Sequence, residues 1–327
     1  MIISRAPVRL SMGGGGTDLP SYYMKRGGFV MSVTINKFVY ILINKRFQES
    51  IRLSYSETEN VEKIDDIKHN IFRESLRFMK IDRQIEIVSV ADVASNSGLG
   101  TSSAFTVSLL NGLYGYRKNY ISLEKLAETA CHIELDVLKG PIGKQDQYAS
   151  AFGGFNAFRF NKDGTVKAEP VRIREEVLME LQSNIFLFYL NKSRSAGSIL
   201  NIQNDKSKEN DKNTIDKLDR IKEIGLQTLK IFENGNIDSF GEILHEHWLT
   251  KKKLSERVSD SYIDEAYDHA LKNGALGGKV VGAGGGGFLL FYCPKNRSKF
   301  ISAMNDFGMK PTWFNFEFEG AKKIYSS

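Results

Sequence analysis

An aspartate and an arginine far apart in the sequence are the first candidates for proton chemistry. Asp146 lies in a segment punctuated by glycine and proline, residues 140–148, just beyond a predicted helix that carries Glu134. A carboxylate there can accept or orient the proton of a substrate hydroxyl. Arg9 is always protonated, so it would hold Asp146 ionised and stabilise a developing oxyanion if the fold brings the two together. Taken singly, an N-capping aspartate and a surface arginine are the simpler interpretations.

A segment rich in glycine and hydroxyl groups lies between a predicted strand and a predicted helix. It runs Ser97, Gly98, Leu99, Gly100, Thr101, Ser102, Ser103 and Ala104. Free backbone N–H groups and the positive end of a helix dipole bind phosphate in such loops, and hydroxyls reach the phosphate or its metal. We therefore predict a phosphate site here. The alternative, a helix start capped by one hydroxyl, does not need this many glycines.

Two further glycine clusters flank this segment in the sequence. The first comprises Gly13, Gly14, Gly15 and Gly16, followed by Thr17 and Asp18. Two interpretations stay open for it: a ligand-binding turn that presents hydroxyl and carboxylate groups to a polyol, or a flexible turn before a helix capped by Asp18. The second, residues 282–287, fits G-x-G-x-x-G but precedes a predicted strand, so it is no dinucleotide fingerprint. We expect a glycine-lined wall next to a ligand or another backbone, with Gly284 and Gly285 as candidate contacts.

Composition narrows the class of protein. The 327 residues are 41% hydrophobic and 26% charged, which is typical of a globular enzyme of two domains, because one core rarely exceeds about 250–300 residues. A net charge of +6 favours anionic small molecules but is too small to indicate nucleic-acid binding. Two cysteines exclude a disulfide framework, and no signal peptide or membrane span is apparent. A cytoplasmic protein is expected.

The pattern of elements predicts an α+β chain with a boundary near Gln182. In residues 1–182 we expect strands over 2–10, 29–35, 38–43 and 84–90, helices over 64–79, 102–117 and 123–138, and a hairpin over 155–171. In residues 183–327 we expect a strand over 185–190, a long helical stretch over 196–232, helices over 239–252, 262–273 and 298–307, and strands over 279–281, 288–292 and 312–318.

Taken in order, the three glycine segments resemble the GHMP kinase superfamily. Ala6-Pro7-Val8-Arg9 with Gly16-Thr17-Asp18 is similar to its first motif, residues 98–102 to its ATP-phosphate motif and residues 282–287 to its third. The chain departs from the family at Ala94, usually a proline, and at Asn96, often a glycine. The resemblance implies an N-terminal domain like ribosomal protein S5 domain 2, a ferredoxin-like C-terminal domain and an active site between them.

By this resemblance, Asp146 is the catalytic aspartate and Arg9 its basic companion, while Ser102 and Glu134 hold Mg²⁺ and residues 97–103 hold ATP. The region around Lys144, the quadruple glycine and Arg194 are most similar to heptose 7-phosphate kinases, which phosphorylate the anomeric hydroxyl on the path to GDP-heptose and surface polysaccharide. Lys144, Arg194 and Arg26 are candidates for the sugar phosphate. A homodimer is possible within this resemblance.

Two other functions remain open from the sequence. One is a kinase for an unphosphorylated sugar such as fucose or galactose. The other is a non-catalytic regulator that senses sugar and ATP, against which the presence of Arg9, Ser102, Glu134 and Asp146 argues.

Overall fold

Two sheets organise the chain in a computed structural model that describes residues 1–192 and 196–326. The larger sheet has the order β12-β1-β2-β5-β3-β4; β6 and β11 also pair with β2, and β7 pairs with β6. The smaller has the order β8-β10-β9. Every pairing is antiparallel except that of β3 with β5. The strands are β1 (Ile2–Gly13), β2 (Gly28–Lys45), β3 (Ile51–Ser54), β4 (Thr58–Val61), β5 (Ile85–Ala91), β6 (Phe155–Phe160), β7 (Val166–Pro170), β8 (Ile185–Tyr189), β9 (Gly277–Val280), β10 (Phe288–Tyr292), β11 (Phe316–Glu317) and β12 (Lys322–Ser326).

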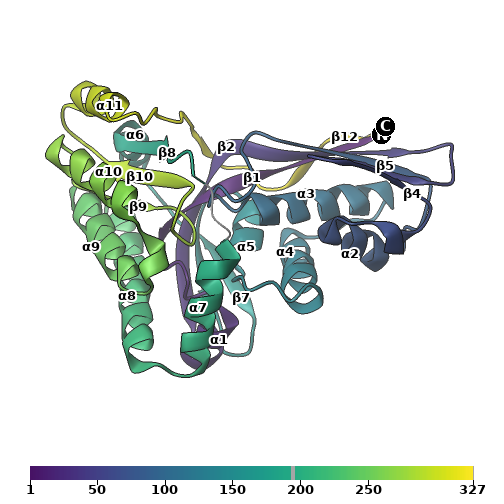
Figure 1. Cartoon of the computed structure of the whole chain (residues 1–327), viewed down its shortest axis with the longest axis horizontal. Coiled ribbons are helices and arrows are strands. Elements are labelled where there is room, and N and C mark those ends of the chain that lie inside the picture. The colour runs from purple at the N-terminus through teal and green to yellow at the C-terminus, as the bar shows by residue number, and fades with distance from the viewer. Residues whose placement is uncertain (193–195, 327) are drawn as a thin grey trace.

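Helices pack against both sheets. In Figure 1, α2, α3 and α4 lie below the larger sheet, and α8, α9 and α10 flank the smaller one. The helices are α1 (Pro20–Arg26), α2 (Asn70–Phe78), α3 (Thr101–Tyr116), α4 (Leu123–Cys131), α5 (Gln145–Phe152), α6 (Glu175–Asn184), α7 (Ala196–Lys208), α8 (Lys212–Asn234), α9 (Phe240–Lys252), α10 (Ser261–Lys272) and α11 (Arg297–Asp306). Within the described ranges, none of them is long and apolar enough to cross a bilayer.

The long strand β2 forms where the sequence predicts two strands. Val8 of β1 pairs with Ile35, but the preceding Pro7 pairs with Phe38, so two residues of β2 bulge out between these pairs. A bulge of this kind bends a strand without ending it. The polar residues 36–37 therefore mark an irregularity in one continuous strand, and the prediction of a break between 35 and 38 is wrong.

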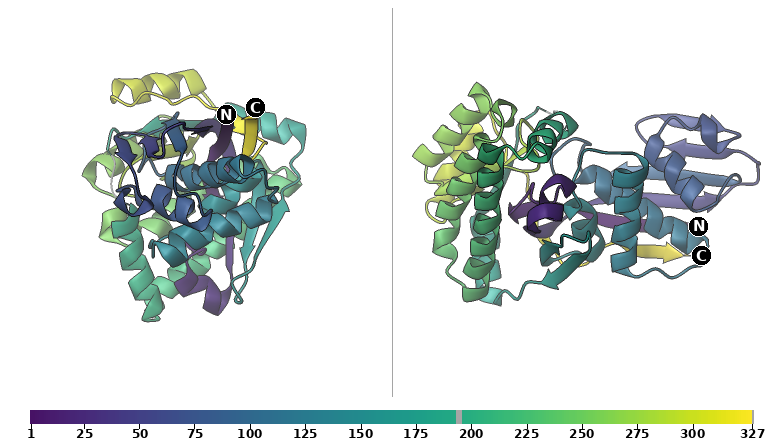
Figure 2. Two further views of the ribbon diagram at one scale, coloured as in Figure 1. Left: turned by 90° about the vertical axis from the view of Figure 1, so that its right-hand side faces the viewer. Right: turned by 90° about the horizontal axis from the view of Figure 1, so that it is seen from below.

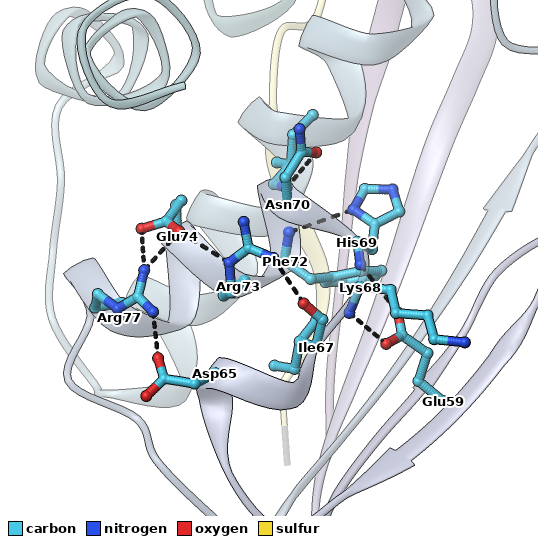
Figure 3. A network of polar contacts seen from close by, with 11 residues as sticks. Glu59, Asp65, Ile67, Lys68, His69, Asn70, Phe72, Arg73, Glu74 and Arg77 are labelled. Atoms are coloured by element: carbon cyan, nitrogen blue, oxygen red, sulfur yellow. Dashed lines mark hydrogen bonds and ion pairs between the residues drawn. The ribbon is translucent and has the colours of Figure 1, made fainter. Parts of the chain in front are cut away.

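A buried carboxylate decides where α2 begins. Glu59, on β4, accepts hydrogen bonds from the backbone N–H groups of Lys68 (2.6 Å) and His69 (3.2 Å), as Figure 3 shows. His69 then caps the helix by accepting from the N–H of Phe72. Because these N–H groups are engaged with Glu59 outside the helix, α2 starts at Asn70 and only a single 3-10 turn, η1 (Ile64–Asp66), precedes it. The predicted continuous helix over 64–79 is thus wrong.

Other predicted helices are shorter or divided. The stretch over 123–138 is α4 followed by a π-helical turn, η2 (His132–Val137), which carries Glu134. The stretch over 196–232 is split into α7 and α8, because the side chain of Asp211 caps a new helix start by accepting from the N–H of Thr214 at 2.8 Å. The sequence pattern of the charged residues between α7 and α8 gives no sign of this break, so the sequence predicts one helical stretch.

The end of the chain returns to the larger sheet. β12 pairs with β1, so the two termini lie together in Figures 1 and 2. The predicted strand over 312–318 is reduced to β11, which pairs with β2, and an isolated bridge at Pro311. Residues 316–326 therefore contribute two strands to the sheet that the first half of the chain builds. The domain boundary near residue 182 stays a prediction.

Replacement of Glu59 by alanine will destabilise the region around α2. The variant leaves the N–H groups of Lys68 and His69 without their acceptor, and each unmet buried donor costs about 1–3 kcal/mol. We expect a loss of about 2–4 kcal/mol in the free energy of unfolding, measured by urea denaturation. Glu62→Ala, a change at an exposed residue of the same region, is the matched control. Equal stability of the two variants would contradict this role for Glu59.

Candidate active site

A buried arginine joins three distant segments at one point. The side chain of Arg9, on β1, is 3% exposed and donates from Nε and one terminal nitrogen to the two carboxylate oxygens of Asp146, both at 2.7 Å. Its other terminal nitrogen donates to the carbonyl oxygen of Gly98 at 2.7 Å. The Arg9 N–H also donates to the carbonyl of Leu99 at 3.0 Å. The fold therefore places Asp146, in the first turn of α5, beside the predicted phosphate loop.

The predicted phosphate loop ends at the start of α3. Gly100 is the N-cap residue with a left-handed φ of 77°, and Ser102, in the first turn, is exposed in the cleft. Ser97 and Thr101 are buried and hydrogen-bond to each other through their hydroxyls at 3.1 Å. Asn96, also in the cleft lining, has a φ of 59°, a conformation that asparagine tolerates better than most residues. The first-turn N–H groups of α3 can therefore receive an anion.

The third glycine cluster packs against this loop backbone to backbone. A Cβ on Gly282 would lie 2.5 Å from the carbonyl oxygen of Gly98, and a Cβ on Gly98 would lie 2.6 Å from that of Val281. Glycine at both positions is what allows this approach. Of the two expectations for this cluster, a ligand or another backbone, the second describes its contact with Gly98. Gly282 also lines the cleft, whereas Gly284 and Gly285 pack on Val258 outside it.

Glu134 is a buried acid in the same cleft. It is 5% exposed and accepts a hydrogen bond from Ser103 at 3.2 Å, a partner that the sequence did not reveal. Burial, and to a smaller degree the charge of Asp146, raises the pKa of Glu134 to about 7. A cation beside it would favour the ionised form. Glu134 and the exposed hydroxyl of Ser102 offer the oxygen ligands that Mg²⁺ prefers.

Elsewhere in the described ranges, no three acidic, histidine or cysteine side chains gather as a metal site. Since Mg²⁺ commonly takes one or two carboxylates and completes its shell with phosphate oxygens and water, two protein ligands suffice.

Asp18 joins the first glycine cluster to the helix that carries Asp146. Its carboxylate accepts from the N–H of Gly16 (3.0 Å) and from the side chain (3.1 Å) and backbone (3.1 Å) of Gln145. Burial raises the pKa of Asp18, the nearby Asp146 adds to the rise, and the N–H donors oppose it. Gly15 and Gly16 line the cleft beside it. Asp18 thereby fixes the start of α5.

Several predicted site residues lie away from the cleft or already bond to other groups of the protein. The hydroxyl of Thr17 lies 2.8 Å from the backbone carbonyls of Gly14 and Phe29, either of which can accept its one proton. Neither Thr17, Gly14 nor the buried Leu99 lines the cleft. Lys144 donates to the carbonyl of Gly164 at 2.7 Å and lines a second cavity, of about 600 Å³. Arg26 is exposed and paired with Asp219. Arg194 lies outside the described residues.

Three basic side chains that the sequence analysis did not select complete the cleft. His247 and Lys251 come from α9, and Lys279 from β9. The sequence does not indicate that His247 or the lysines at the end of α9 face a cleft. Only the packing of α9 on β9 turns these side chains inward.

The sequence was compared with family models and with known proteins. Residues 67–154 match the model of the GHMP kinases N terminal domain, and residues 228–309 match that of the GHMP kinases C terminal. A D-glycero-alpha-D-manno-heptose 7-phosphate kinase of Campylobacter jejuni is 31% identical to the chain over 98% of both sequences. The chain belongs to the GHMP kinase family.

Solved and curated relatives agree with this family. The crystal structure of a D-glycero-D-manno-heptose 1-phosphate kinase from Bacteroides thetaiotaomicron matches with a TM-score of 0.82 and 26% identity, covering 100% of both chains. A galactokinase of Thermotoga petrophila is 24% identical, over 98% of this chain and 99% of its own. The predicted α+β architecture with GHMP N- and C-terminal domains is confirmed. The protein is a sugar kinase of this family, a phosphotransferase with an alcohol group as acceptor.

Replacement of Glu134 by glutamine will change the pH dependence of stability. The pKa of Glu134 is about 7 in the folded protein against 4.5 as its ordinary value, so the folded state binds the extra proton between these pH values. The contribution of Glu134 to wild-type stability therefore falls as pH rises from about 4.5 to 7. The glutamine variant lacks this loss and will gain stability relative to wild type on the order of 3 kcal/mol between pH 5 and 8. Urea denaturation without divalent cations measures it.

The matched control is Glu124→Gln, which alters an exposed acid on the neighbouring helix α4. Its stability relative to wild type will not depend on pH. A Glu134→Gln variant that behaves like this control would contradict the buried, protonated state of Glu134.

Proposed function

We propose that the protein transfers the terminal phosphoryl group of ATP to the anomeric hydroxyl of D-glycero-D-manno-heptose 7-phosphate, giving the 1,7-bisphosphate. The observation that carries the chemistry is the ion pair of the buried Arg9 with the partly exposed Asp146 beside the first turn of α3. The choice of sugar is supported by the relative from Campylobacter jejuni, at 31% identity over nearly the whole chain. The product would feed GDP-heptose and surface polysaccharide synthesis.

In this proposal, Asp146 orients the acceptor hydroxyl and takes its proton as the new O–P bond forms and the bond from the terminal phosphorus to the oxygen of the leaving ADP breaks. Arg9 donates to both carboxylate oxygens, which keeps the side chain of Asp146 in one orientation. Phosphoryl transfer depends mainly on positioning and on neutralisation of charge, with little covalent work for the protein. The N–H groups at the start of α3 would hold the phosphates of ATP opposite Asp146.

Mg²⁺ would be held by Ser102 and Glu134 together with phosphate oxygens. When bound, it supplies positive charge that offsets the negative charge of the transferred group. The hydrogen bond from Ser103 keeps the carboxylate of Glu134 in the cleft, and Glu134 would bind the cation in its ionised form. ATP is the donor used by GHMP kinases, whereas the metal, a cytoplasmic location and a homodimer stay predictions.

The named relatives leave the position of the phosphate on the acceptor open. One is named for heptose 7-phosphate and another for heptose 1-phosphate, and more distant relatives are galactokinases. A kinase for an unphosphorylated sugar is therefore the second candidate.

Replacement of Asp146 by asparagine will remove most of the activity but little of the nucleotide binding. The amide cannot take a proton, and the loss of a positioned proton acceptor lowers kcat by about 10²- to 10⁴-fold. We expect an ATP dissociation constant within about threefold of wild type, since the N–H donors of α3 are untouched. Asp136→Asn, at an exposed acid on η2, is the control. Near-normal turnover of the Asp146 variant would remove this residue from the mechanism.

A panel of acceptors tests the proposed substrate. We expect kcat/KM for heptose 7-phosphate to exceed that for unphosphorylated heptose, heptose 1-phosphate, galactose and fucose by at least tenfold, because a buried phosphate site rejects sugars that leave it empty. ADP release measures turnover, and ³¹P NMR identifies the phosphorylated oxygen. Activity that is equal or greater with an unphosphorylated sugar would overturn this assignment.

A further inference from the structure

Three basic side chains meet on the wall of the cleft formed by the second half of the chain. His247, Lys251 and Lys279 are 1%, 8% and 2% exposed, and all three line the same cleft as Arg9 and Ser102. Two come from one helix, α9, one turn apart, and the third comes from the strand β9 on which that helix packs. They are buried in the protein but face the space where substrates must enter.

Among the described residues, the contacts of these side chains in the fold include no carboxylate. Nζ of Lys279 lies 3.2 Å from Nδ1 of His247, and Nζ of Lys251 donates to the carbonyl of Gly282. Within residues 1–192 and 196–326, neither lysine is paired with a carboxylate. Nε2 of His247 is buried and has no hydrogen-bond partner among these residues. In the described part of the chain, the cluster thus has two amines without a carboxylate partner, and one ring nitrogen without a hydrogen-bond partner, to offer a ligand.

Burial of like charges disfavours their protonated forms. Burial, and then the charge of Arg9, lowers the pKa of Lys251 to about 7. Burial and the neighbouring Lys251 lower the pKa of Lys279, and burial and both lysines lower that of His247. An anion in the cleft would reverse these effects, because an opposite charge nearby favours the protonated state. Unpaired buried cations are costly in a folded protein, so a bound anion gives this arrangement a physical reason.

Phosphate is the anion that the cleft must receive. A phosphate ester carries close to two negative charges and several acceptor oxygens, and lysine binds it as a compact point charge. Lys251 reaches the carbonyl of Gly282, and Gly282 packs on Gly98 of the phosphate loop. The basic cluster therefore lies next to the loop but belongs to the opposite wall. Lys144 and Arg26, two of the residues expected to bind the acceptor's phosphate, are paired elsewhere.

We propose that His247, Lys251 and Lys279 form a phosphate subsite, which binds a phosphate group of the substrates from the second wall of the cleft. Two sources share this chemistry: the phosphate already carried by the acceptor sugar, and the phosphoryl group that ATP transfers. Binding of the sugar's own phosphate at this subsite rests on the proposed function, whereas binding of the transferred phosphoryl group does not depend on which sugar is the acceptor. The subsite gives the phosphate of the sugar a binding partner, which neither Lys144 nor Arg26 provides.

The test uses Lys279→Met and, independently, Lys251→Met, with Lys253→Met as the control. The substitution keeps an unbranched side chain and removes the charge, and Lys253 is an exposed residue at the end of the same helix. Removal of an unpaired buried charge does not threaten folding, which circular dichroism checks. Binding of inorganic phosphate in the absence of nucleotide is measured by calorimetry. We expect at least tenfold weaker binding in both cleft variants and no change in the control.

Kinetics distinguish the two sources of phosphate. If the acceptor's phosphate occupies the subsite, KM for heptose 7-phosphate will rise at least tenfold in Lys279→Met while KM for unphosphorylated heptose stays unchanged. If the transferred group occupies it, kcat will fall to the same extent with both acceptors. Phosphate binding and kinetic constants that match those of Lys253→Met in both cleft variants would overturn the subsite.

The outcome separates this inference from the proposed function. A wild-type enzyme that prefers an unphosphorylated sugar, combined with weakened phosphate binding in Lys279→Met, would overturn the heptose phosphate assignment and support the subsite. A wild-type preference for heptose 7-phosphate that both cleft variants retain, with unchanged phosphate binding, would support the assignment and overturn the subsite.

Discussion

The guanidinium group of Arg9 is the contact on which the geometry of the cleft depends. It is buried, and its donors are divided between the carboxylate of Asp146 and the carbonyl of Gly98. Loss of either acceptor would leave the buried guanidinium short of hydrogen-bond partners, although the Asp146 carboxylate itself is partly exposed. The fold is therefore held to an arrangement in which the acid and the phosphate loop are neighbours. The geometry of the proposed active site and the stability of the fold depend on the same contact.

The second wall of the cleft is positioned by backbone rather than by side chains. Gly282 meets Gly98 so closely that a methyl group on either would overlap a carbonyl oxygen. This contact ties the loop that follows β9 to the loop that precedes α3, and with it the end of α9, where Lys251 donates to the Gly282 carbonyl. The glycine clusters thus do more than make room for a ligand. They set the distance between an acidic side of the cleft and a basic one.

The order and composition of the motifs were sufficient to predict the family, the α+β class and the proximity of Arg9, Asp146 and the loop before α3. Residues within a few positions of a glycine cluster carry a local signal, as for Ser102 and Asp18. The start of α2 could not be predicted, because Glu59 acts across nine or ten residues from another element. Likewise, the sequence does not distinguish the three consecutive lysines at 251–253. Only tertiary packing buries Lys251 and leaves Lys253 exposed. β12 was missed because its neighbour in the sheet, β1, lies at the other end of the chain.

The proposed reaction requires that Asp146, held by Arg9, meet the acceptor hydroxyl opposite the nucleotide phosphates. A crystal structure of the protein with a non-hydrolysable ATP analogue and heptose 7-phosphate tests it most directly. The account predicts the anomeric oxygen at about 2.6–3.2 Å from a carboxylate oxygen of Asp146, with the terminal phosphate at the start of α3. An acceptor bound with its anomeric oxygen beyond reach of Asp146, while the Arg9 ion pair stays intact, would contradict it.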